Sequence, residues 1–156
     1  YDAIDVGDKA LSIVYNPPEL SIDAQFVEGA GILHDIGMFL TNAPHIYCTG
    51  DYPYISHGYL GSNLLKNEGF PKHALVCERH TGTGLSLETI IKRKLPIPHR
   101  DMQPQSLEEK VICFADKFYS KSKLRKEKSV KKIRKKLAKY GKHQVKKFDE
   151  WCELFL

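Results

Sequence analysis

Apolar residues recur every three or four positions along almost the whole chain, and this spacing constrains the fold more than any other feature of the sequence. The period places apolar side chains on one face of an α-helix, and no segment shows the strict alternation of a half-buried strand. Asp23 and Ser106 are predicted helix N-caps, and Glu109 completes a capping box with Ser106. We therefore predict an all-α fold, a single-domain bundle of about seven or eight helices that spans residues 1–156. The helical segments lie within residues 6–14, 26–36, 54–65, 71–80, 86–94, 106–118, 130–140 and 145–155.

The composition excludes several classes of protein. With 156 residues, of which 42% are apolar and 28% charged, the chain matches one globular domain. No apolar run approaches the roughly 20 residues that span a bilayer, so we expect no membrane association. The four cysteines, Cys48, Cys77, Cys113 and Cys152, stand far apart without a CxxC pair, which predicts free thiols rather than a disulfide framework or a zinc ribbon. A cytoplasmic location is the resulting expectation.

The net charge of +5 conceals a strong asymmetry. Residues 117–147 hold 15 of the 24 lysine and arginine residues and one acid, Glu127, for a net charge of +14, so the rest of the chain carries −9. Residues 122–156 are predicted to form a basic helical extension packed on the body. A solvated helix face is the favoured interpretation of its lysines, and a patch for nucleic acid or for a polyanionic substrate is the alternative. Only Phe118, Tyr119 and Tyr140 are aromatic within residues 117–147, so nucleic acid is not favoured as a partner.

Five residues with metal-binding side chains lie on these apolar stripes. An ionised aspartate among apolar neighbours is costly to bury without a compensating partner, and a metal ion supplies one. Any single motif is a weak signal, but ligands from four separate helices suit a site inside a helical bundle. The five candidates are His34 and Asp35 in GILHDIG, His57 in ISHG, His80 in ERHTG and Asp116 in CFADK.

The order and intervals of these motifs resemble the HD superfamily of metal-dependent phosphohydrolases, whose HDIG variant is similar to the string from Leu33 to Gly37. The resemblance extends to about Lys121 and implies an HD-type helical fold. The two additional histidines, His57 and His80, resemble those of the two-metal branches.

The resemblance also implies a ligand set. His34, Asp35 and Asp116 would hold one divalent ion, and Asp35 would bridge to a second ion held by His57 and His80. Imidazole and carboxylate ligands suit Fe, Mn, Ni, Co or Zn. The sequence leaves open which of these metals binds and whether one or two ions are present.

The chain departs from the family pattern at its first helix. Family members usually carry a further histidine shortly before a pair that corresponds to Val6-Gly7, and the matching position holds Asp2. Three explanations stay open: Asp2 replaces the histidine as a ligand, the histidine lies upstream of this chain, or the first metal site has one ligand fewer.

The activity that the resemblance implies is hydrolysis of a phosphomonoester or phosphoanhydride bond by a metal-activated water. A phosphorylated small molecule, nucleotide-like, is the expected substrate, with Asp35 and Lys117 as catalytic residues. Arg79, Lys117 and Lys121 are candidates for holding phosphate oxygens because they stand beside predicted ligands. The alternative is a catalytically degenerate HD domain that binds a nucleotide or nucleic acid. The sequence does not predict an oligomeric state.

Overall fold

The computed structural model describes residues 2–15, 21–120 and 126–156, with the backbone alone described at Asp2. Over these residues the fold is all-α, as predicted, with eight α-helices and one very short hairpin. The α-helices are α1 (Asp2–Tyr15), α2 (Ala24–Leu33), α3 (His57–Asn67), α4 (Pro71–Glu78), α5 (Leu87–Lys92), α6 (Leu107–Asp116), α7 (Val130–Ala138) and α8 (Lys142–Phe155). The remaining elements are the 3-10 helices η1 (Ile36–Leu40), η2 (Pro44–Ile46) and η3 (Tyr54–Ser56) and the strands β1 (Asn42–Ala43) and β2 (Cys48–Thr49).

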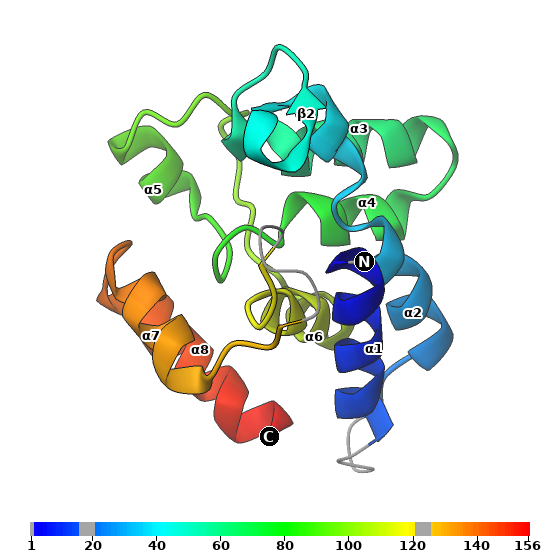
Figure 1. The fold of residues 1–156 in the computed structure, drawn as a ribbon, viewed down its shortest axis with the longest axis vertical. Coiled ribbons are helices and arrows are strands. Elements are labelled where there is room, and N and C mark those ends of the chain that lie inside the picture. The colour runs from blue at the N-terminus through cyan, green and yellow to red at the C-terminus, as the bar shows by residue number, and fades with distance from the viewer. Residues whose placement is uncertain (1, 16–20, 121–125) are drawn as a thin grey trace.

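Helix α6 lies at the centre of the molecule (Figure 1), with α1 and α2 on one side and α7 and α8 on the other. Phe114 of α6 is fully buried, and its ring centroid lies 5.1–5.4 Å from those of Phe118, Phe148 and Phe155. The basic C-terminal helices therefore share one hydrophobic core with α1, α2 and α6. The division into one domain with an extension over residues 122–156 stays a prediction.

Most helix ends follow the predicted local chemistry. The side chain of Asp23 accepts a hydrogen bond from the backbone N–H of Phe26, which confirms it as the N-cap of α2. Ser106 and Glu109 form the predicted capping box at the start of α6. Pro71 occupies the first turn of α4, where its missing N–H has no helical partner to lose.

Three helix ends differ from the prediction, and each carries a candidate ligand. α2 ends at Leu33, so His34 is its C-cap and Asp35 begins a turn into η1. α4 ends at Glu78, two residues before His80. Asp116 is the last residue of α6 rather than an interior residue. The predicted period continued past these ends because His34, His80 and Phe118 stay buried after the helical backbone stops.

The segment between η1 and η3, where no helix was predicted, contains the hairpin. β1 and β2 pair antiparallel, with Asn42 opposite Thr49 and Ala43 opposite Cys48. Two-residue strands show no alternation that the sequence could reveal, and the hairpin turns through Tyr47 in a left-handed conformation at φ 63°. Within the described residues, no helix is long and apolar enough to cross a membrane. The expected cytoplasmic location stays a prediction.

Candidate metal centre

The five predicted ligands converge on one buried cluster. The Nε2 atom of His34 lies 3.1 Å from an oxygen of Asp116 and 3.2 Å from an oxygen of Asp35. The other oxygen of Asp35 lies 3.1 Å from Nε2 of His80 and 3.6 Å from Nε2 of His57. All three histidine residues are at least 97% buried. The cluster therefore joins four separate segments of the chain that are distant in sequence.

Each histidine is oriented by the same local hydrogen bond. The Nδ1 atoms of His34, His57 and His80 contact the backbone carbonyl of the residue three positions earlier: Gly31, Tyr54 and Cys77, respectively. A carbonyl oxygen only accepts, so each Nδ1 carries the proton and donates it. Nε2 of the neutral ring then presents its lone pair to the cluster, as a metal-binding histidine does.

This arrangement fits a cation. Nε2 of His57 and Nε2 of His80 lie 2.9 Å apart, and two lone pairs at that distance repel each other unless a proton or a metal ion lies between them. Ligand atoms within 4.8 Å of one another form two groups that share His80: His34, His80 and Asp116 in one, and Asp35, His57 and His80 in the other. Three imidazoles and two carboxylates are a donor set compatible with a divalent transition metal.

Asp116 is in a position that disfavours an isolated carboxylate. It is buried and ends α6, where the partial negative charge of the helix C-terminus opposes a further negative charge. Lys117 compensates in part, with Nζ 2.9 Å from the second oxygen of Asp116 and 3.1 Å from the carbonyl of His80. Burial opposes a charged imidazole at His34, but Asp35 and Asp116 outweigh it and raise the pKa of His34 well above its usual range. The cluster thus attracts positive charge.

Two buried cysteines hold the backbone of the ligands. Sγ of Cys77 donates to the carbonyl of His34 at 3.0 Å, and Sγ of Cys113 donates to the carbonyl of His80 at 3.4 Å. Burial raises the pKa of both thiols to about 12, so they remain protonated donors. All four cysteines are free, as predicted.

Gln144 of α8 holds the turn that follows His80, and the sequence analysis did not predict this role. The side-chain oxygen of Gln144 accepts from the backbone N–H of Thr83 at 2.7 Å and from its hydroxyl at 2.8 Å, and the side-chain amide donates to the carbonyl of Gly84 at 3.0 Å. The turn held in this way follows His80 directly. The sequence signal for it is its spacing: Gln144 stands four residues before Phe148, on the apolar face of α8, while its partners lie about 60 residues away.

A cavity of about 530 Å³ adjoins the cluster. His57, His80 and Asp116 of the cluster belong to its lining, as does Lys117. Helices α5 and α7, which lie apart on the same side of the molecule in Figure 1, supply another part of its lining. The volume is within the range of small-molecule sites. The cluster is thus open to a ligand of nucleotide size.

The other predicted contacts have different outcomes. Lys117 lines the cavity, but Arg79 does not: its guanidinium donates to Glu109 at 2.7 Å and so ties α4 to the start of α6. A substrate contact by Arg79 therefore stays a prediction without geometric support. Lys121 and the side chain of Asp2 lie outside the described residues, and the three explanations for Asp2 stay open.

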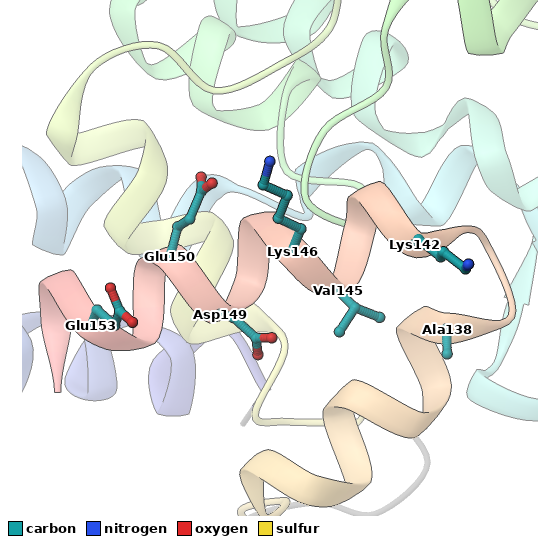
Figure 2. Close-up of a pocket in the computed structure, with 7 residues that line it drawn as sticks. All are labelled: Ala138, Lys142, Val145, Lys146, Asp149, Glu150 and Glu153. Carbon is teal, nitrogen blue, oxygen red and sulfur yellow. The ribbon is translucent and has the colours of Figure 1, made fainter.

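A separate hollow of about 450 Å³ lies along α8 (Figure 2). Ala138 of α7 and six residues of α8 line it. Two lysines and three acids are mixed among them, and no ligand of the histidine–aspartate cluster takes part. The cavity at the cluster is therefore the candidate site.

Comparison with known protein families agrees with this geometry. The profile of the HD domain family matches residues 6–121, which include all five residues of the cluster. The chain belongs to the HD domain family. No solved structure matches it at a significant level.

Curated relatives of this HD domain protein give limited information on activity. An uncharacterised protein of Methanocaldococcus jannaschii is 34% identical over 131 residues, which are 83% of this chain and 70% of that protein. A protein of Picrophilus torridus named tRNA (cytidine(56)-2'-O)-methyltransferase is 32% identical over 99 residues, 63% of this chain and 25% of that protein. The protein of the same name from Thermoplasma volcanium is 26% identical over 99 residues and is also covered to 25%.

Proposed function

We propose that this HD domain protein is a metal-dependent phosphohydrolase that cleaves a phosphomonoester or phosphoanhydride bond of a nucleotide-like substrate. The observation that carries the proposal is the convergence of three oriented imidazoles and two carboxylates in a cluster that adjoins a basic cavity. Metal ligands and anion-binding residues in one site are what hydrolysis of a phosphate ester requires.

The proposed roles follow from the contacts. Asp35 places one oxygen against His34 and the other toward His57 and His80, which suits a carboxylate that bridges two ions. When bound, divalent ions lower the pKa of a water molecule and neutralise phosphoryl oxygens. Lys117 orients Asp116 and lines the cavity, where its ammonium stabilises negative charge on the substrate. His57 and His80 keep their Nε2 atoms directed at the cluster.

Turnover after metal reconstitution tests the proposal. The purified protein would be loaded with Mn, Fe, Co, Ni or Zn in turn and assayed for phosphate release from nucleoside mono-, di- and triphosphates. We expect metal-dependent release that Asp35→Asn abolishes and that Asp51→Asn, a change of an exposed acid outside the cluster, leaves intact. Absence of turnover with every metal in a protein shown to contain it would overturn the proposal.

A second candidate function is a degenerate HD domain that binds nucleotide or nucleic acid. The net charge of +14 over residues 117–147 favours it, as do the two relatives whose names refer to a tRNA methyltransferase. Lys131 and Lys135 of α7 are exposed and do not line the cavity, so they belong to a surface that a polyanion could contact. Steeply salt-dependent retention of RNA by a protein without turnover would favour this candidate.

A further inference from the structure

The lining of the cavity has more positively charged side chains than carboxylates. Four basic side chains line it, and among the described residues of its lining Asp116 alone carries a carboxylate. Lys117 is already engaged with Asp116 through the 2.9 Å contact. The other three basic side chains of the lining are Arg93, which follows α5, Lys128, which precedes α7, and Lys136 of α7.

Packing of α7 places two of these cations together. The backbone N–H of Lys128 donates to the carbonyl of Phe118 at 2.7 Å, which brings Lys128 beside the end of α6. Ile133 and Leu137 are buried in the core and fix the face that α7 turns inward. Lys136, next to Leu137, then reaches the same part of the cavity and contacts the side chain of Lys128.

Two ammonium groups in contact destabilise the protein that holds them. Burial and then the charge of Lys136 lower the pKa of Lys128 to about 8. Lys136 is exposed, as Lys131 and Lys135 of the same helix are, but it alone of these three lines the cavity. A bound anion would offset the repulsion between Lys128 and Lys136.

We propose that Lys128 and Lys136 form a second phosphate subsite, so that the substrate carries at least one phosphate group beyond the one at the histidine–aspartate cluster. Resting on the proposed function, this narrows the substrate class to compounds with linked phosphates, such as nucleoside di- and triphosphates. An ammonium pair matches a dianionic phosphate, and the bonds it forms are charge-assisted.

Other residues of the cavity lining suit the nucleoside part of such a substrate. Tyr140, two residues after the end of α7, lines the same cavity as Lys136. The guanidinium of Arg93 lies 5.4 Å from the centroid of the Tyr140 ring, and the ring is half exposed. Leu85 and Leu95 add apolar surface nearby. A cavity of about 530 Å³ holds a ligand of this size, whereas a long polynucleotide would lie over the outward lysines instead.

Binding of phosphonates tests the subsite without relying on turnover. Methylenediphosphonate presents two linked phosphate-like groups that resist hydrolysis, and methylphosphonate presents one. Calorimetry would compare them on the purified metal-containing protein and on protein stripped of metal. The variant Lys128→Gln/Lys136→Gln removes the pair, and Lys131→Gln/Lys135→Gln is a control with the same change in charge on the outer face of the same segment.

We expect the cavity variant to bind methylenediphosphonate at least about tenfold more weakly, because each lost charge-assisted bond corresponds to about a factor of ten or more. Methylphosphonate binding should change far less, and the control variant should change either ligand by less than about twofold. Without ligand, the cavity variant should melt at or above the temperature of the unchanged protein, since the repulsion is gone. That last measurement separates loss of the subsite from loss of the fold.

Other outcomes would overturn the subsite. An equal loss of methylenediphosphonate affinity in the cavity variant and the control variant would mean a general electrostatic effect. No loss of affinity in either variant would mean that Lys128 and Lys136 hold no phosphate. Loss of RNA retention in the control variant, with diphosphonate binding intact in the cavity variant, would assign the basic segment to nucleic acid. If no nucleotide is hydrolysed but diphosphonate binding depends on Lys128 and Lys136, the subsite stands and the proposed hydrolase activity fails.

Discussion

At the scale of single residues, His80 is the most connected ligand of the cluster. It belongs to both groups of ligand atoms, its Nδ1 is fixed by Cys77, and its carbonyl accepts from Cys113 and Lys117. The sequence predicted its identity as a ligand. It could not predict that both groups share it, because that depends on where α4 stops.

His80→Ala should therefore weaken metal binding throughout the cluster. Each group keeps two of its three ligands, so we expect the metal affinity to fall by more than the roughly 10- to 100-fold loss typical of an outer hydrogen-bond partner. Elemental analysis after dialysis measures it, with the exposed His99→Ala as control. Full metal content in His80→Ala would contradict the shared role.

Lys128 makes anion binding depend on pH. Its pKa of about 8 arises from burial and then from Lys136, with Asp116 and Lys117 as the other charges that act on it. A lysine with a lowered pKa loses its proton as the pH rises through that value, so its attraction for an anion is present below about pH 8 and lost above it.

Methylenediphosphonate affinity should accordingly fall above pH 8, approaching about tenfold per pH unit. Titrations between about pH 7 and about pH 9, either side of that value, would be compared with those of Lys128→Gln, which retains only the pH dependence of the ligand and of the remaining groups. Identical slopes in the two proteins would show that Lys128 does not titrate in this range.

At the scale of elements, periodicity predicted the helices well and their ends less well. The amphipathic stripes gave the positions of α1 to α8 because burial of one helix face is a local property. The predicted ends of α2 and α4, and the predicted position of Asp116 inside a helix, were wrong because buried side chains continue past the last helical hydrogen bond. The hairpin of β1 and β2 was missed because two-residue strands show no alternation, and the contacts of Gln144 were missed because its partners lie about 60 residues away in the sequence.

The contact between η1 and α3 depends on a pair of glycines. A Cβ atom at Gly37 would collide with the carbonyl of His57 and with the backbone of Gly61, none of which is the movable end of a side chain. This close approach brings the segment after Asp35 against the start of α3, where His57 lies.

Gly37→Ala should destabilise the protein by about 3 kcal/mol or more, because the backbone must separate. It should also reduce metal content by displacing His57. Gly29→Ala is the control, since its added Cβ makes an ordinary 3.4 Å contact with His73 and removes a glycine from α2, which favours folding by about 0.5–1 kcal/mol. Urea unfolding measures both, and equal stability of the two variants would contradict the argument.

Gln144→Leu should uncouple α8 from the turn after His80. It leaves the backbone N–H of the buried Thr83 without its partner, at a cost of about 1–3 kcal/mol. We expect lower stability in urea together with faster loss of metal during dialysis, whereas Gln105→Leu, at an exposed position, should change neither. Unchanged metal retention in a destabilised Gln144→Leu would limit the role of Gln144 to the fold.

At the scale of the whole molecule, the two charged parts of the chain meet at the cavity. The body, with a net charge of −9, supplies the carboxylates that attract metal ions, and the segment 117–147, with +14, supplies the cations that attract phosphate. Bound metal ions would offset the negative charge of the carboxylates, and bound phosphate would offset the positive charge of the lysines. The ligands and the fold therefore stabilise each other.

Removal of metal should lower the melting temperature of the entire chain, because the cluster joins α2, α3, the segment after α4 and α6. A ligand that binds only the folded state at 100 times its dissociation constant contributes about 2.7 kcal/mol. For a chain of this size that corresponds to about 5–10 °C. Scanning calorimetry with and without a chelator measures the difference, with elemental analysis to show that the metal has left. In Asp116→Asn, which loses a charged ligand, the chelator should have a much smaller effect. An unchanged melting temperature after verified removal of metal would mean that the cluster is stable without an ion, held instead by protons shared among its histidines and aspartates.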